Sequence, residues 1–207
     1  GTAANTQSLT LNAGTGGAIS ATGNIGATTT LATLTITNSN VATFSGSVAT
    51  GTSVVLTDTT DAANITFNGA LTTPTLTTAA QGYDLDILGG GTAVTNNVSF
   101  ANTGTLALGD AAADTLTFTG GLTATAPSAV TLNGEIRSAG ATVSIGDSNT
   151  GVTLAGTTSI IDTTNNGGNA AGGGITLGGA IDGTAANTQS LTLNAGTGGA
   201  ISATGNI

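Results

Sequence analysis

The stretch GTAANTQSLTLNAGTGGAISATGNI at positions 1–25 occurs a second time, without a change, at positions 183–207. Identity over so long a stretch does not arise by chance, so the sequence repeats itself from position 183 onward. A long internal repeat predicts a fold that grows along one axis, each unit packing on its neighbours. We therefore expect one full repeat over residues 1–182 and the start of the next over residues 183–207, both within one continuous solenoid cut from a longer tandem array.

A shorter phrase recurs inside this period. Two apolar residues flank a small polar one, as in Leu9-Thr10-Leu11, and Asn, Gly or Asp often follows. Further examples are residues 34–36, 65–69, 85–87, 116–118, 130–134, 152–154 and 175–179. A period of two indicates β-strands, and Thr, Val and Ile favour the pleated surface. Since no 3.6-residue pattern stands out, the chain is predicted to be all-β.

Three longer segments align with one another and give the order of elements. They are VVLTDTTDAANITFNG (54–69), LALGDAAADTLTFTGG (106–121) and VSIGDSNTGVTLAG (143–156), each a strand, a turn with Asp, a strand and a Gly. A β-sandwich needs bulky side chains in its core, whereas this chain has four Phe, one Tyr and no Trp. Small aliphatic residues suit a narrow core of stacked coils, so we predict a parallel β-helix.

The expected length of one coil gives the number of turns, and the apolar positions of the strands give the core. At about 20–25 residues per coil, the repeat over positions 1–182 makes roughly eight coils and advances about 38 Å along the axis. Ser and Thr between the apolar positions are expected to form polar ladders outside. The side chains predicted to stack in inward columns are Leu9, Leu11, Leu34, Ile36, Ile65, Phe67, Leu116 and Phe118.

Charge excludes several classes of function. Arg137 is the one basic residue against ten acidic ones, which gives a net charge of −9. Nucleic-acid binding is excluded because phosphate neutralisation needs clustered Lys and Arg. No run of 18 apolar residues occurs, so no membrane insertion is predicted. The near absence of Lys and Arg leaves trypsin-like proteases few sites, which favours an extracellular or cell-surface location.

Aspartates in the predicted turns are the candidates for metal binding. Turn carboxylates can hold Ca²⁺, which takes six to eight oxygen ligands, but Asp is also a good turn former by itself. The GGxGxD calcium repeat is absent. We therefore expect turn formation, with Ca²⁺ as the weaker hypothesis and no other cofactor. The residues concerned are Asp58, Asp61, Asp110, Asp114 and Asp147.

Two further groups bear on catalysis. Asp84 and Asp86 alternate with apolar residues, so both carboxylates lie on one face of a strand, as glycosidase pairs can. A β-helical polysaccharide lyase would need a base, and Arg137 is the one basic candidate. Glu135 and Arg137 are expected to form a surface ion pair instead. The sequence predicts no catalytic residues and no enzyme.

Threonine-rich strands suggest one more function. The segments TLTIT (33–37) and TLTFT (115–119) place threonines on an outward face, as ice-binding solenoids do. Ice binding needs a strictly regular array, and the apolar positions are unevenly spaced along the chain. Ice binding is therefore a distant alternative.

The stretch GGGITLGGAID (172–182), which the repeat joins to GTAANTQSLTLNAGTGGAISATGNIGATTTLATLTIT (1–37), resembles a known kind of protein. It is similar to the repeat regions of large secreted bacterial proteins of the filamentous haemagglutinin and autotransporter-like adhesin type. The resemblance covers the whole chain in style and carries no catalytic residues. It implies a right-handed β-helix, export across a Gram-negative envelope, and a role in adhesion, surface filaments or cell–cell contact. The secretion domain that defines such proteins is absent from these residues.

These observations lead to three hypotheses. The first is a structural and adhesive extracellular stalk or filament of tandem repeats, and the second is a self-assembling sheath or filament subunit. The third, a polysaccharide-active enzyme on a β-helix, is a distant alternative. The expected partners are adjacent repeats of the same chain or copies packed end to end or side by side. A cell-surface or carbohydrate ligand is a further candidate.

Overall fold

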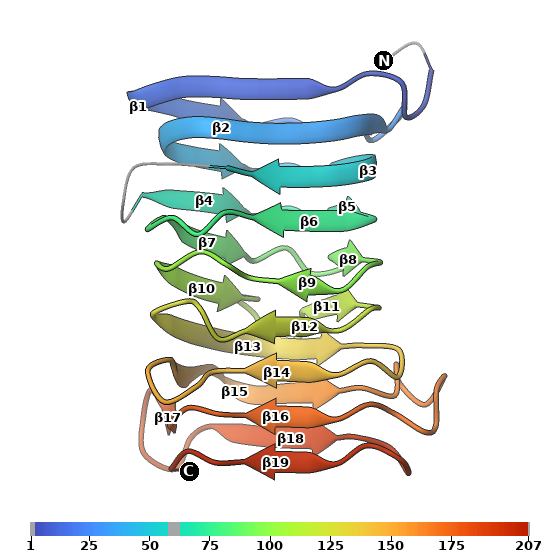
Figure 1. The fold of residues 1–207 in the computed structure, drawn as a ribbon, viewed down its shortest axis with the longest axis vertical. Coiled ribbons are helices and arrows are strands. Elements are labelled where there is room, and N and C mark those ends of the chain that lie inside the picture. Colours follow the sequence, from blue (N-terminus) through green and yellow to red (C-terminus); the bar gives the residue numbers. More distant parts are fainter. Residues whose placement is uncertain (1–2, 58–62, 207) are drawn as a thin grey trace.

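The protein is a β-solenoid, described by a computed structural model over residues 3–57 and 63–206. These residues form 19 β-strands and no helix, so none of them belongs to a helix that could span a membrane. All ladders between the named strands are parallel, and the chain winds through about eight turns (Figure 1). The all-β parallel β-helix predicted from the sequence is confirmed.

Each turn crosses three faces, which we name A, B and C in chain order. Face A holds the first parts of β1 (Leu9–Ala21) and β2 (Leu31–Phe44), the second part of β3 (Val48–Leu56), β6 (Thr75–Thr78), β9 (Val98–Ser99), β12 (Leu122–Ala124), β14 (Val143–Ile145), β16 (Ile175–Leu177) and β19 (Ile201–Ala203).

Faces B and C take the remaining strands. Face B holds the second parts of β1 and β2, β4 (Asn64–Phe67), β7 (Asp84–Ile87), β10 (Thr105–Leu108), the first parts of β13 (Ala129–Arg137) and β15 (Gly151–Asp162), and β17 (Ile181–Gly183). Face C holds the first part of β3, β5 (Leu71–Thr73), β8 (Ala93–Val94), β11 (Thr115–Phe118), the second parts of β13 and β15, and β18 (Ser190–Asn194).

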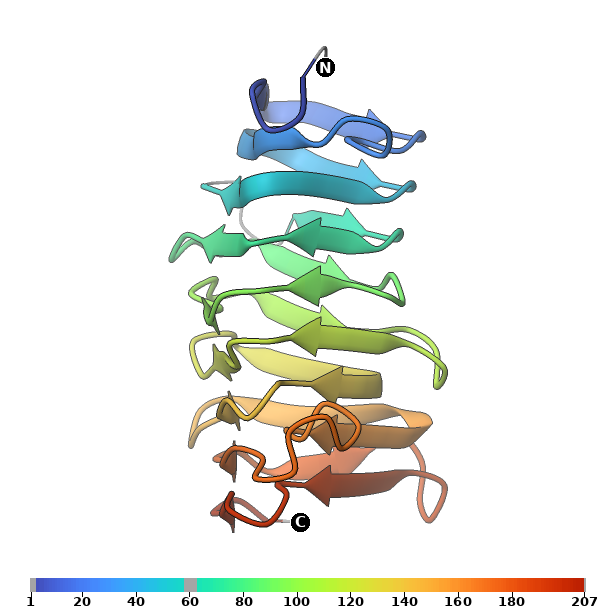
Figure 2. The ribbon, with the colours of Figure 1, turned by 90° about the vertical axis from the view of Figure 1, so that its right-hand side faces the viewer.

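The winding is right-handed, as the resemblance implies. In Figure 1 the strands of face A run leftwards at the front and those of face B run rightwards behind, while the chain descends from its N-terminus to its C-terminus. Crossovers between parallel strands are almost always right-handed, because the twist of a strand favours that hand. Seen from the side, the strands of successive turns are stacked above one another along the axis (Figure 2).

The turns between strands absorb differences in coil length. Along face B the distance between paired residues ranges from 20 positions, Ile65 to Leu85, to 29 positions, Val152 to Ile181. Within each face the paired residues keep one register, and the register shifts inside the longer strands lie at the corners. The roughly eight coils predicted for one repeat are therefore close to the observed winding, although the longest coil exceeds the length expected from the sequence.

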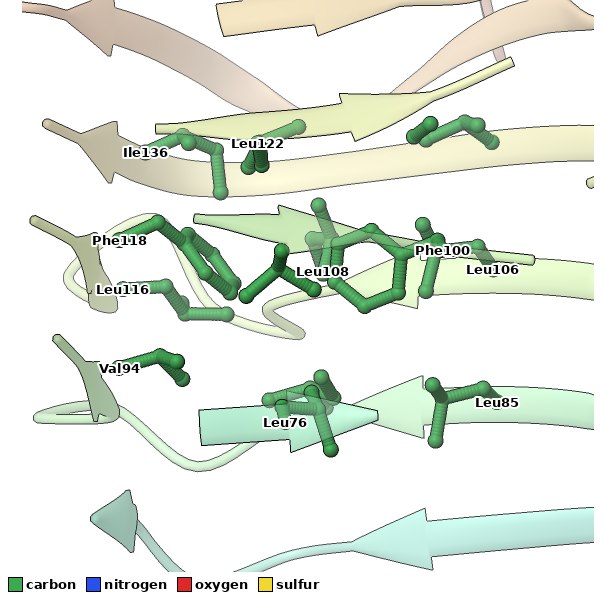
Figure 3. Close-up of a cluster of buried hydrophobic side chains, with 14 of the residues drawn as sticks. Leu76, Leu85, Val94, Phe100, Leu106, Leu108, Leu116, Phe118, Leu122 and Ile136 are labelled. Atoms are coloured by element: carbon green, nitrogen blue, oxygen red, sulfur yellow. The ribbon is translucent and has the colours of Figure 1, made fainter. Parts of the chain in front are cut away.

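The core consists of inward columns of aliphatic and aromatic side chains (Figure 3). Of the predicted inward residues, Leu34, Ile36, Ile65, Phe67, Leu116 and Phe118 are fully buried, whereas Leu9 and Leu11 in the first rung are partly buried against the core. Phe44 stacks on Phe67, its partner in the next turn, with ring centroids 5.0 Å apart. Each fully buried side chain of this kind contributes roughly 1.5–3 kcal/mol.

Some hydroxyl side chains point inward, where the sequence analysis expects Ser and Thr outside. The Thr50 hydroxyl donates to that of Thr73 at 2.7 Å, and the Thr92 hydroxyl donates to the Gly89 carbonyl at 2.8 Å. All three side chains are buried in strands or turns of face C. Buried hydroxyls are tolerated here because turn carbonyls and neighbouring hydroxyls satisfy them.

Two of the aligned segments fold as predicted but at different corners. Residues 143–156 run from a strand of face A through a turn to face B. Residues 54–57 and 63–69 hold strands of faces A and B, and the predicted turn with Asp between them lies outside the described residues. Residues 106–121 run from face B to face C. Similar phrases therefore serve at more than one corner of the solenoid.

The two identical segments, 1–25 and 183–207, also lie on different faces. Leu9 pairs with Leu34 on face A, whereas its counterpart Leu191 pairs with Ser159 on face C. Likewise Ile19 lies on face B, whereas its counterpart Ile201 lies on face A. One repeat therefore covers seven full turns and two of the three faces of the eighth turn. As a result, the first strand of the repeat lies on face A in the first copy and on face C in the second.

Candidate interaction surface

Face A presents a column of hydroxyl side chains to solvent, which we name the hydroxyl ladder. On most strands of face A the residues on either side of the central one point into the core, so the central residue points outward. In eight of nine rungs that residue is Thr or Ser, and Val55 is the exception. The hydroxyl ladder is Thr10, Thr35, Thr77, Ser99, Thr123, Ser144, Thr176 and Ser202.

The lower part of the ladder is a sheet of its own. Strands β9, β12, β14, β16 and β19 form a five-stranded sheet in which each ladder residue pairs with the next, from Ser99 to Ser202. Above it, the inward Thr78 hydroxyl bridges β6 to β9 by donating to the Ser99 carbonyl at 3.2 Å and accepting from the Ala101 N–H at 2.7 Å. The ladder thus continues across the boundary between the two sheets.

The ladder hydroxyls are unused within the solenoid. In the part of the chain that the structure describes, none of the eight is hydrogen-bonded to another protein group. All eight side chains are exposed or half-buried. A hydroxyl can donate one hydrogen bond and accept two. The ladder therefore offers both kinds of group to water or to a partner.

Face A is also free of charge. None of its strand residues is Asp, Glu, Lys or Arg. Face B carries Asp84, Asp86 and Asp182, and face C carries Glu135, Arg137 and Asp162. The remaining described acids, Asp110, Asp114 and Asp147, lie at corners. On a chain with a net charge of −9, face A is the surface where another negatively charged molecule meets the least repulsion.

Asp84 and Asp86 lie on one face of β7, as predicted, with Leu85 and Ile87 buried. Asp86 accepts hydrogen bonds from the Asn64 amide at 2.7 Å and the Thr66 hydroxyl at 3.2 Å. Asp84 accepts one from the Thr105 N–H at 2.6 Å. Both carboxylates therefore tie neighbouring turns of face B together.

The turn aspartates bind backbone groups. Asp114 accepts from the N–H groups of Asp110 and Ala111 at 2.9 and 2.8 Å, and Asp147 accepts from that of Asn149 at 2.7 Å. Burial, a hydrogen bond to Asp114 and the charge of Asp114 raise the pKa of Asp110. Among the described residues no three acidic side chains gather as metal ligands, and Asp58 and Asp61 lie outside those residues. These contacts support the interpretation as turn formers.

The predicted ion pair of Glu135 and Arg137 is confirmed, with 2.6 Å between the carboxylate and the guanidinium. The hydrogen bond from Glu135 raises the pKa of Arg137. Asp162, the partner of Arg137 in the next turn, accepts from the Thr164 and Asn166 N–H groups at 2.8 and 2.6 Å and from the Thr164 hydroxyl. Burial alone raises the pKa of Asp162, but these bonds and the Arg137 charge outweigh it and lower the pKa.

The two threonine-rich segments lie on different faces. Residues 33–37 are part of β2 on face A, whereas residues 115–119 belong to β11 and the residue after it on face C. They do not form one array. The regular array is the hydroxyl ladder, which confirms the expected polar ladders of outward Ser and Thr, although Ser99, Ser144 and Ser202 were not among the residues named in advance. The sequence pattern that marks these serines is a Ser between two apolar residues, as in the recurring three-residue phrase of the strands.

An open groove of about 650 Å³ lies at a corner beside the ladder. Its lining includes Ser144, Asp147, Thr176 and Thr204. Hydroxyls and one carboxylate can bind a polar ligand through hydrogen bonds.

Neither protein-family models, nor curated proteins, nor solved structures match the chain.

Proposed function

We propose that the chain is part of a structural and adhesive extracellular stalk or surface filament built from tandem repeats. The observation that carries this proposal is the junction between the two repeats. Residue 182 is the last of one repeat and residue 183 the first of the next, and both lie inside β17, Ile181–Gly183. The junction is therefore a strand of the solenoid, and repeats joined in this way form one rod.

The interactions inside the rod suit a stiff, lasting structure. Parallel ladders pair the backbone from turn to turn, and the buried columns run through the same turns. The chain has a single Lys or Arg among 207 residues, which limits cleavage by trypsin-like proteases outside a cell. The proposed tasks are length, stiffness and surface contact, and no catalytic role is proposed.

Immunogold electron microscopy tests this function. Antibodies are raised against the repeated segment GTAANTQSLTLNAGTGGAISATGNI and applied to intact cells of the organism that carries the gene. We expect gold particles in rows along thin threads at the cell surface. Label that appears only after the cells are permeabilised would contradict the proposal.

The second candidate is a self-assembling sheath or filament subunit, in which solenoids pack side by side. The uncharged hydroxyl ladder favours it, because such packing needs outer faces that match between neighbours. Electron micrographs distinguish the two, since a stalk gives single thin threads and a sheath gives ordered multi-strand tubes.

A further inference from the structure

We propose that the hydroxyl ladder is the surface on which a second copy of the chain packs side by side. This inference rests on the proposed extracellular filament and deepens its second candidate form, in which solenoids pack side by side, by naming the surface and the partner. Three features of face A support this proposal: its lack of charged residues, the free hydroxyls of its ladder, and its area.

The distribution of charged residues favours face A as the contact surface and a second copy of the chain as the partner. Two copies that each carry a net charge of −9 repel one another unless their carboxylates stay apart. Contact through face B would bring Asp84 and Asp86 towards the partner, and contact through face C would bring the ion-paired Glu135 and Arg137 towards it. Contact through face A places only uncharged side chains between the chains. A strongly basic partner would instead be drawn to faces B and C.

The hydroxyl ladder matches a copy of itself. Most soluble homodimers have a two-fold axis, which brings the same patch of both copies together. Hydroxyls suit this symmetry because each can donate to and accept from an identical group. The eight ladder hydroxyls are not committed to bonds within the described chain. Their short side chains on in-register strands also give a flat surface, so two ladders can approach closely.

The area of the face predicts a weak contact that adds up along a filament. Nine rungs about 4.8 Å apart, with about three residues per strand at about 3.3 Å each, cover roughly 430 Å² per copy. A standard stable interface buries about 800 Å² per partner. A single pair of chains should therefore associate only at high concentration. Tandem repeats raise the effective concentration of each further contact, so long chains should bundle much more strongly.

Charged substitutions in the 207-residue chain test the proposal. Thr123 and Thr176 are both changed to Asp in one variant and to Lys in a second. A control variant carries Asp at two outward positions of face B, Thr43 and Thr131. An aspartate is compatible with an outward strand position, because β7 carries two. Sedimentation velocity over a range of concentrations measures association, and circular dichroism confirms that each variant folds.

We expect the unaltered chain to associate as its concentration rises, and the face B control to do the same. The Asp variant and the Lys variant should each associate at least about tenfold more weakly, because like charges then face each other. A mixture of the two should regain association, since Asp then faces Lys whether the copies run parallel or antiparallel. End-to-end stacking would leave all variants alike and so separates the two modes.

Three outcomes would overturn the inference. They are an unaltered chain that stays single at every concentration, an Asp variant that associates like the unaltered chain, and a mixture that regains nothing. In each case labelled threads on cells would still support the stalk, so failure of this inference is distinguishable from failure of the proposed function.

Discussion

The two copies of the repeated segment have the same sequence and different surroundings. Their local geometry is shared: Asn5 and its counterpart Asn187 both have φ of 60°, and Gly14 and Gly196 have φ of 69° and 67°. The first copy forms a single strand over Leu9–Ala21, whereas the second forms two, β18 and β19, with a turn between them. They rest on different turns of the solenoid and on different faces.

This difference separates what the local sequence determines from what its neighbours determine. Asn and Gly set the turn, through the same side-chain to backbone bonds in both copies. The face depends on the neighbouring turn of the solenoid. The corner of the first copy lies on β2, whereas that of the second lies on a loop in which Asn165, Asn166 and Gly167 have positive φ. A segment with small side chains can serve at either place.

The largest expected effect is on the dipolar broadening between two nitroxide labels, which reports whether they lie close together. The chain has no cysteine, so nitroxide labels can be placed in pairs. Ile160→Cys with Thr192→Cys places labels on paired residues of face C and should give strong dipolar broadening. Thr176→Cys with Thr192→Cys places them on different faces and should give none.

Thr123→Cys with Ser144→Cys, a paired position on face A, is the positive control. If the second copy occupied the same face as the first, Thr192 would lie on face A over Thr176. Broadening in the Thr176 pair and not in the Ile160 pair would therefore contradict the shift of face.

The next effect is on stability at two equivalent glycines. Gly14→Ala should cost about 1 kcal/mol, because a side chain is disfavoured at positive φ while no atom lies within 4 Å of the new Cβ. At Gly196 the new Cβ would lie 2.5 Å from the Ala170 carbonyl oxygen, so Gly196→Ala should cost about 3 kcal/mol. Urea denaturation measures both. Equal costs would mean that the two copies share one environment.

Acid should act on the turn against which the second copy packs and should spare the first copy. Asp162 pairs with Asn194 of the second copy, whereas Asn12 of the first pairs with Asn38. The folded pKa of Asp162 is lowered, so its contribution is complete above the unfolded value of about 3.9 and is lost as pH falls through the folded value below it.

Hydrogen exchange by NMR checks this prediction. Protection of the Thr164 and Asn166 amides, which Asp162 accepts from, should fall below about pH 4, while that of the Gly14 amide stays constant. In the Asp162→Asn control the protection should no longer change with pH. A pH-independent response in the unaltered chain would argue against the lowered pKa.

The smallest effect is at the shared turn bond. The Asn12 side chain accepts from the Gly14 N–H at 3.0 Å, and Asn194 accepts from that of Gly196 at 3.1 Å. By urea denaturation, Asn12→Ala should cost about 0.5–1 kcal/mol, and Asn194→Ala slightly more, because the Asn194 amide also donates to the Thr164 hydroxyl at 3.3 Å. A difference much above about 1 kcal/mol would show that the surroundings change even this local bond.

The strands and the core could be predicted from the sequence, because alternate residues of a strand point to opposite sides, so the apolar ones point into the core and the small polar ones point outward. Leu34, Ile36 and Phe67 follow from that pattern alone. The faces do not follow, since all three use the same phrase and turn lengths vary from coil to coil. Polar ladders of outward Ser and Thr were predicted, but which residues share one ladder was not, because the outward residues of one face are far apart in the chain and only the winding brings them together. The buried Thr50 and Thr73 were missed because most threonines of the described chain lie outside, and nothing in the residue type marks the buried ones.

The incomplete eighth turn has a consequence for any thread made of this unit. A further unit joined in the same way would present its column of hydroxyls on the adjacent side, and only the third unit after the first would return it to the original side. A neighbour lying along one side would then meet that column for about 37 Å in every 110 Å. Successive stretches of one thread would hold different neighbours, and a bundle would interlock in three dimensions instead of spreading as a flat layer.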